Sequence, residues 1–222
     1  VRAKSNDPSG ASKYILAYND SNLNGLHLRT NGSRLIANFG ISAQLLPAFT
    51  STDWMFAYLI LDRTGNMAMG INGGSEVTTS IANESINTSN FTRLGIGSSQ
   101  NLLNFWPGLL GEIQASRYTN IADSNVNPTT LSNARLTGYP SSWTNGTVVA
   151  HYKFDGDNMT EVLKDRSASG NDLTGVNLDM ADVGTTADYP EHYTESLAST
   201  IKTSSKTSGY LRSLAALQST VH

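Results

Sequence analysis

The chain has 222 residues, a formal net charge of −3, and 15% charged residues against a usual share of about 25%. This length fits one large all-β domain or two small domains. A net negative charge argues against a nucleic-acid-binding protein, because such proteins usually carry an excess of basic residues to contact the phosphates. The absence of cysteine excludes disulfides, thiolate zinc sites and iron–sulfur clusters. No apolar run is long enough to span a membrane.

Small polar residues dominate the composition. Ser, Thr, Asn and Gly together account for 90 of the 222 residues. These residues favour turns and compete with the hydrogen bonds of helices. Hydrophobic residues still make up 38% of the chain, which argues against a disordered composition. The composition therefore predicts the all-β class, with many short strands joined by polar turns.

Residues 1–12 are polar and contain Pro8 and Gly10, so they are interpreted as an N-terminal arm. The most apolar run, Asp53–Asp62, is predicted as a central strand. The Asn-Gly pairs that begin at Asn31 and Asn72 mark hairpin turns. The other predicted strands are Lys13–Tyr18, Leu26–Thr30, Arg34–Ile41, Met67–Ile71, Glu76–Ile81, Phe91–Ile96, Gly111–Tyr118 and Thr147–Phe154.

Two stretches carry helical signals. Val126–Leu136 predicts one short helix, capped near Thr129 and Thr130. Residues 191–222 are predicted as a partly helical C-terminal tail, because Leu211, Leu214, Leu217 and Val221 recur at helical spacing. Two interpretations of the tail stay open: a frayed polar terminus, or a helix that docks on a neighbouring subunit.

Four motifs follow one another along residues 13–140. They are the strand Trp54–Asp62, the hairpin Met69–Gly73, the strand Arg93–Gly97, and the run from Trp106-Pro-Gly108 to Tyr118-Thr-Asn120. Their order and spacing resemble the laminin-G-like branch of the concanavalin A-like lectin/glucanase superfamily. The resemblance implies an antiparallel β-sandwich with a jelly-roll-like strand order.

The later part of the chain departs from that family. Tyr152–Gly156 and Asp165–Thr174 resemble the segment that opens most members, but here they come last. Either the chain begins inside one repeat and ends early in the next, or one sandwich is circularly permuted. Sandwich termini often lie close together, which makes permutation structurally easy. We favour a single domain over residues 13–190, with Thr147–Phe154 paired into it.

Signals for catalysis and metal binding are weak. Glucanases of this fold carry carboxylates that alternate along one strand, and no Glu-x-Asp-x-Glu run occurs here. We therefore expect no enzyme. Asp155, Asp157 and Asn158 form the nearest acidic group, which suits either Ca²⁺ or a solvated turn. The second acidic loop, Asp165 with Asn171-Asp172, is interpreted as a set of turn caps.

Aromatic residues near turns suggest sugar binding, because a saccharide stacks its apolar face on a ring. The candidates are Trp143 with its sequence neighbours Tyr139 and Asn145, and Trp106. Trp106 stands where the related family has a buried Phe, so a core role competes with the binding role. Trp143 is also open to either role. The histidines are scattered, and His27 and His151 are interpreted as structural.

Three functions compete. The first is a non-catalytic lectin-like module that binds a glycan or other ligand at a surface. The second is a structural or decorating subunit of a larger assembly such as a phage virion, contacting copies of itself or virion neighbours through its tail. The third, a glycoside hydrolase, is disfavoured by the missing carboxylates. The first two imply an extracellular or virion location.

Overall fold

A computed structural model describes most of the strands and their connections. The described residues are 1–7, 12–19, 25–31, 34–40, 42–48, 54–62, 65–72, 75–82, 84, 93–99, 104–118, 146–154, 157–183, 201–202 and 210–213. The predicted helix at Val126–Leu136 lies outside them. Within this part of the chain the elements are almost all β-strands, and the all-β prediction is confirmed.

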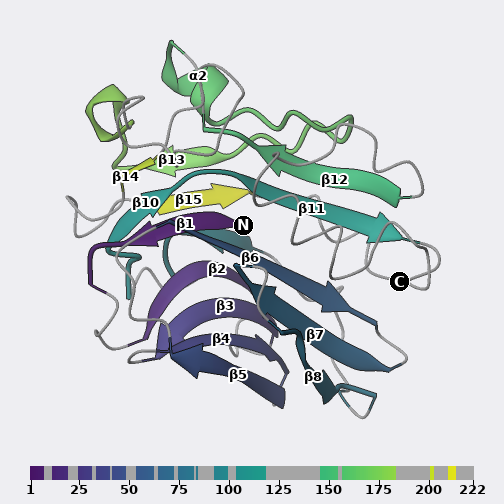
Figure 1. Cartoon of the computed structure of the whole chain (residues 1–222). Coiled ribbons are helices and arrows are strands. Elements are labelled where there is room, and N and C mark those ends of the chain that lie inside the picture. Colours follow the sequence, from purple (N-terminus) through teal and green to yellow (C-terminus); the bar gives the residue numbers. More distant parts are fainter. Residues whose placement is uncertain are drawn as a thin grey trace.

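One sheet has six strands in the order β14–β10–β1–β6–β7–β8 (Figure 1). The strands are Arg2–Ser5 (β1), Trp54–Leu61 (β6), Asn66–Ile71 (β7), Val77–Ser80 (β8), Gly108–Leu110 (β10) and Ile201–Lys202 (β14). All of the pairings between neighbouring strands are antiparallel. The strong apolar run predicted at Asp53–Asp62 is confirmed as the strand β6.

The prediction of an N-terminal arm is wrong for residues 2–5. They form β1, which pairs with β10 on one side and β6 on the other. Only Ala3 of this strand is apolar, so the segment carries no alternating hydrophobic signal. The two flanking strands supply the hydrogen-bond partners that make the segment a strand, and Ala3 is fully buried between them.

A second sheet has seven strands in the order β13–β15–β9–β2–β3–β4–β5. The strands are Lys13–Asn19 (β2), Gly25–Asn31 (β3), Arg34–Phe39 (β4), Ser42–Ala48 (β5), Arg93–Ile96 (β9), Thr174–Val176 (β13) and Tyr210–Ser213 (β15). Asn31, the last residue of β3, pairs with Arg34, the first residue of β4, as the predicted hairpin requires.

The described parts of the predicted helical tail are strands. Tyr210–Ser213 lies between β9 and β13, with Leu211 opposite Ile96 on one side and Gly175 on the other. The strand β14 pairs with β10 at the edge of the other sheet. The leucine spacing at 211, 214 and 217 was therefore misleading at Leu211, because two sheet edges supply partners that a local pattern does not contain.

A two-stranded sheet joins Ile113–Tyr118 (β11) to Gly146–Tyr152 (β12). The late strand predicted at Thr147–Phe154 is observed as β12, but among the described residues it pairs with β11 alone and with neither large sheet, so the expectation that it completes a sheet of the sandwich is not confirmed. A short helix, Met159–Val162 (α2), and a 3-10 turn, Met180–Asp182 (η2), follow β12. No helix in the described part of the chain is long and apolar enough to cross a membrane.

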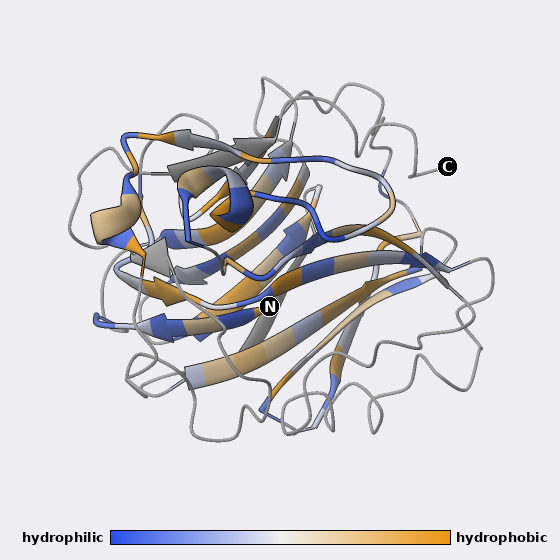
Figure 2. Ribbon diagram, turned by 90° about the horizontal axis from the view of Figure 1, so that it is seen from above, coloured by the Kyte–Doolittle hydropathy of each residue, from blue (hydrophilic) through white to orange (hydrophobic). Residues whose placement is uncertain are grey.

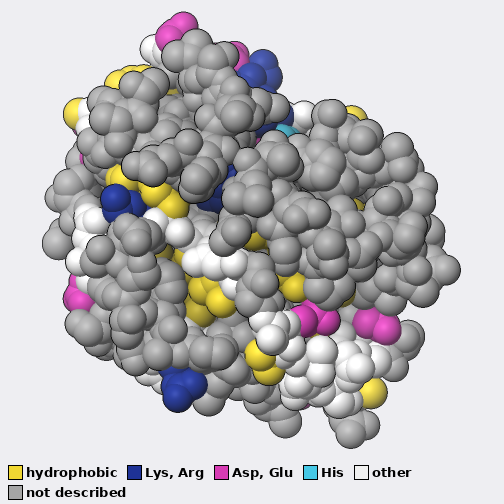
Figure 3. Space-filling view, viewed as in Figure 1, with side chains coloured by type: hydrophobic (Ala, Val, Ile, Leu, Met, Phe, Trp, Pro, Cys, Tyr) yellow, Lys and Arg dark blue, Asp and Glu magenta, His cyan; other side chains and the backbone are white. Residues whose placement is uncertain are grey.

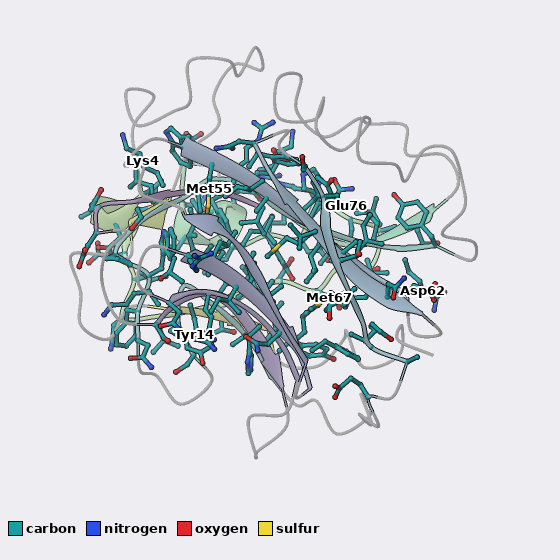
Figure 4. The ribbon with its side chains drawn as sticks, turned by 60° about the horizontal axis from the view of Figure 1, so that its bottom comes forward. Lys4, Tyr14, Met55, Asp62, Met67 and Glu76 are labelled. Carbon is teal, nitrogen blue, oxygen red and sulfur yellow. The ribbon has the colours of Figure 1, made fainter. Side chains whose placement is uncertain are left out.

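Both large sheets contribute side chains to one hydrophobic core. Met55, Met67 and Met69 come from the six-stranded sheet, whereas Leu28 and Phe39 come from the seven-stranded sheet. Figure 4 shows Met55 and Met67 between the strands and Asp62 towards the edge of the molecule. Figure 2 shows hydrophobic and hydrophilic residues alternating along several strands, the pattern of strands with one buried face. The core fixes which face of each sheet points outward.

Candidate ligand-binding face

The outer face of the seven-stranded sheet follows from the strand register. Leu28 and its neighbour Ala37 belong to the core. His27 precedes Leu28 on β3, and its partner Asn38 follows Ala37 on β4. Side chains alternate along a strand, so His27 and Asn38 point to the face opposite the core. Ala17 of β2 completes this row beside His27.

Four residues on this face form what we call the outer cluster: Tyr14, His27, Arg29 and Asn38. They come from three neighbouring strands, with Tyr14 opposite Arg29 and His27 opposite Asn38. The Tyr14 and His27 rings meet edge to face with their centroids 5.4 Å apart. Tyr14, Arg29 and Asn38 are half-buried, whereas His27 is 8% exposed. Figure 4 shows Tyr14 on the curved strands, away from Met55 and Met67.

Arg29 is oriented by a neutral group. Its Nη1 donates to the Ser12 hydroxyl over 2.7 Å. No carboxylate pairs with Arg29 in the described part of the chain. A guanidinium carries five donors in a fixed fork. Within the part of the chain that the structure describes, the Ser12 hydroxyl is thus the group that orients Arg29, and no carboxylate offsets its charge.

His27 is buried without a hydrogen bond from its Nε2 to any described residue. Burial first, and the nearby Arg29 charge second, lower the pKa of His27 from 6.5 to about 4. The imidazole is therefore neutral at pH 7. Because the Nε2 nitrogen is itself buried, the half-buried guanidinium of Arg29 is the group of the two that a ligand at this face can contact.

Acidification should unfold the protein partly through His27. Between pH 6.5 and 4 the unfolded chain binds a proton at His27 that the folded chain does not, so stability falls as the pH falls. The shift corresponds to about 3 kcal/mol, present above pH 6.5 and lost by about pH 4. In urea unfolding across this range the wild type should lose stability more steeply than His27→Gln as the pH falls. Parallel curves would contradict the assignment.

The sequence-predicted sugar-binding residues fall into two groups. Tyr139, Trp143 and Asn145 lie outside the described residues. Trp106 is fully buried, and its indole Nε1 donates to the carbonyl oxygens of Lys4 and Leu109 at 3.2 and 3.3 Å. Its ring is part of the core and offers no free face to a ligand, which agrees with the alternative interpretation of Trp106 as a structural residue.

The candidate Ca²⁺ ligands are only partly described. Asp155 lies outside the described residues, and Asp157 is exposed. Asn158 is the N-cap of α2, where its Oδ1 accepts from the Glu161 amide at 3.2 Å. Among the described residues no three His, Asp or Glu side chains are gathered as a metal site would need.

The interpretation of Asp165 as a turn cap is confirmed. Its carboxylate is 5% exposed and accepts from the amides of His151, Ser167 and Asn171 and from the Ser167 hydroxyl, at 2.8 to 2.9 Å. The Asp165 amide in turn donates to Asp172 Oδ1. This network closes the loop onto β12, so the second acidic loop is structural.

A buried, hydrogen-bonded pair of side chains lies beside this loop. The imidazole Nε2 of His151 and the Oε1 of Glu112 are 2.5 Å apart, with the side chains 17% and 5% exposed. The pair links the start of β11 to the end of β12. His151 is thereby structural, as predicted, whereas His27 has no such partner among the described residues.

Comparisons with known proteins found no match. No family model, no curated protein and no solved structure matches the chain. The local sequence contained one signal for the outer cluster, since His27 and Arg29 are two residues apart in a predicted strand and so share a face. Asn38 and Tyr14 join them only through the register of three strands, which the sequence does not encode locally.

Proposed function

We propose that the chain is a non-catalytic, laminin-G-like binding module that recognises glycans at a surface. In this proposal the two large sheets form a concanavalin A-like sandwich with jelly-roll strand order. Antiparallel pairing, the shared core and the ordered sequence motifs support it.

The observation that carries the proposal is the outer cluster. Saccharide sites combine an aromatic ring, which takes the apolar face of a sugar, with a few fixed polar groups that orient its hydroxyls. Tyr14 supplies a half-buried ring, and Arg29 and Asn38 supply polar groups on adjoining strands. The rigid sheet holds these side chains in place without a mobile loop.

The absence of acidic residues from the strands supports a role in binding over hydrolysis. No Asp or Glu occurs in any strand of the described structure. A glycosidase needs two carboxylates at a fixed separation, and strands that alternate acidic residues are how this fold class provides them. The hydrolase remains the third and least supported function.

Trp143, with Tyr139 and Asn145, stays a predicted second platform outside the described residues. Ca²⁺ also stays a prediction: adding Ca²⁺ should raise the melting temperature if Asp155 and Asp157 bind it, and an unchanged melt would remove the idea.

Replacing Tyr14 tests the site directly. On a glycan array Tyr14→Ala should lose retention by roughly tenfold, since stacking on an aromatic ring contributes on the order of 1 kcal/mol or more. Tyr14→Phe keeps the ring and serves as the matched control, with near-normal retention expected. Trp143→Ala, run beside them, reports on the predicted second platform. A wild-type chain that retains no glycan at any position of the array would reject the proposed function.

The alternative function, a decorating or structural subunit of an assembly such as a phage virion, relied on a free C-terminal tail. That argument weakens because residues 201–202 and 210–213 are strands within the two sheets. An extracellular or virion location fits both functions and is part of the proposal.

A further inference from the structure

Four Asn-Gly pairs occur in the chain, beginning at Asn24, Asn31, Asn72 and Asn145. Asparagine is one of the thermolabile residues of proteins. When glycine follows, the next backbone nitrogen can reach the side-chain carbonyl carbon, because glycine has no Cβ to obstruct the approach. The structure describes two of these asparagines, Asn31 and Asn72. Their dipeptides are identical, so any difference in their reactivity comes from the fold.

Asn72 is held by the neighbouring strand. Its Oδ1 accepts a hydrogen bond from the Phe56 amide over 2.8 Å, and its own amide donates to the Phe56 carbonyl oxygen over 2.9 Å. Its backbone is left-handed, with a φ of 50°. The Asn72 side chain is thus directed towards β6, and it must give up a hydrogen bond before its carbonyl carbon can turn to the next residue of its own chain.

Asn31 lacks these restraints. It is the exposed last residue of β3, and no hydrogen bond to a described residue holds its side chain. Its backbone belongs to the strand, opposite Arg34, and does not have the left-handed conformation of Asn72. Within the described part of the chain, the Asn31 side chain can therefore turn towards the next backbone nitrogen without breaking a hydrogen bond.

We propose that Asn31 is a site of spontaneous deamidation, at which an exposed amide on the outer face becomes a carboxylate. The Gly32 backbone nitrogen attacks Cγ of Asn31 and gives up its proton. The Cγ–Nδ2 bond breaks, and ammonia leaves with that proton, so that a five-membered cyclic imide remains. Water then opens the imide at one of its two carbonyl carbons, which leaves aspartate or isoaspartate at position 31. The two steps exchange NH₂ for OH and need no oxidant or reductant.

The new carboxylate appears beside two arginines. Asn31 lies two residues after Arg29 on β3 and opposite Arg34 on β4, so the three side chains project from the outer face. Residues directly opposite each other have Cβ atoms about 4.5–5.5 Å apart. Among the described residues no carboxylate offsets Arg29, and deamidation supplies one. The charge of the outer face therefore changes with the age of the protein.

Isoaspartate changes the backbone as well. It routes the main chain through the former side-chain carbons, which adds one methylene between positions 31 and 32. The alternation of side chains along a strand depends on an unbroken backbone repeat, so the pairing of position 31 with Arg34 is disturbed. Deamidation thus acts on the end of the hairpin that carries Arg29, and this inference does not depend on the proposed glycan binding.

The modified protein can be separated by charge. On the side of the molecule drawn in Figure 3, the described basic and acidic side chains are interspersed and form no patch of one sign. The chain should therefore elute from an anion exchanger according to its net charge of −3, and one further negative charge should delay its elution.

The experiment incubates the full chain at mildly alkaline pH and follows the peptides around Asn31 and Asn72 by mass spectrometry. The peptide with position 31 should gain the mass difference between OH and NH₂ roughly ten times faster than the peptide with position 72. A hydrogen bond of up to about 1.5 kcal/mol that must break first corresponds to about tenfold in rate. In urea the two peptides should react at nearly equal rates, because their dipeptides are the same.

Two variants identify the reacting side chain. Asn31→Gln lengthens the side chain by one methylene, so its cyclic imide has six members and forms more slowly. Asn31→Ser has no side-chain carbonyl and cannot form an imide. Position 31 is exposed, so both variants should fold. Both should lose the late-eluting species that carries the modified peptide of position 31.

Three outcomes would overturn the inference. Equal rates at positions 31 and 72 in the folded chain would show that the fold does not select Asn31. A position 31 that reacts in urea but not in the folded chain would show that the hairpin protects it. A late-eluting species that persists unchanged in Asn31→Gln and Asn31→Ser would place the reaction elsewhere. Glycan retention, measured on the array with freshly prepared protein, is decided separately from all three.

Discussion

Replacing Asp165 with Asn should lower the free energy of unfolding by about 3 kcal/mol. The carboxylate is buried and accepts four hydrogen bonds, three of them from backbone amides of His151, Ser167 and Asn171. A hydrogen bond to a charged group contributes roughly 1.5–3 kcal/mol to stability. A buried donor that loses its partner adds a separate cost of about 1–3 kcal/mol.

The amide of Asn cannot take over this role. Its oxygen can replace one carboxylate oxygen, but its NH₂ group would then face further N–H donors. The Asp165 Oδ1 atom bridges β12 to the loop at Ser167, while Oδ2 receives the Ser167 hydroxyl and the Asn171 amide. Whichever way the Asn amide is turned, one of these two pairs of donors loses its acceptor.

Thermal unfolding measures the effect. In a chain of this size a loss of about 3 kcal/mol lowers the melting temperature by about 10 °C. Asp157→Asn makes the same chemical change at an exposed position and should shift the melt by less than about 1 °C. Equal melting of Asp165→Asn and the wild type would show that the loop is not held by this carboxylate.

Deleting residues 191–222 should abolish cooperative folding. The deletion removes β15, which pairs with β9 and β13 on its two sides, and β14, which pairs with β10. The backbone groups of β9 and β13 that face β15 would lose their partners, and each group that water cannot then reach costs about 1–3 kcal/mol. The total is comparable to the whole stability of a typical domain, about 5–15 kcal/mol.

Sedimentation and circular dichroism of two truncated chains test this expectation. A chain ending at Pro190 lacks both strands and should aggregate or unfold without a cooperative transition. A chain ending at Ser213 keeps both strands and should melt cooperatively. If the chain ending at Pro190 instead folds normally and only its oligomeric state changes, the segment is an anchoring tail. The assembly function would then become the better proposal.

The sequence by itself determined the all-β class and the strands with strong local patterns. Asp53–Asp62 concentrates apolar residues, and Leu26–Thr30 alternates them and is followed by the Asn-Gly pair at Asn31, so neighbouring residues alone contain the signal. The turn-capping role of Asp165 was also accessible, because its hydrogen-bond partners lie mostly within six residues of it.

The tertiary structure alone decided the rest. The strands β1 and β15 have too few apolar residues in alternation to be found locally, and their hydrogen-bond partners are distant in sequence. The outer cluster depends on the same register, which places Tyr14, His27, Arg29 and Asn38 on one face of three strands. Strand pairing is a long-range interaction between backbones, and side-chain patterns record it only where one face is strongly apolar.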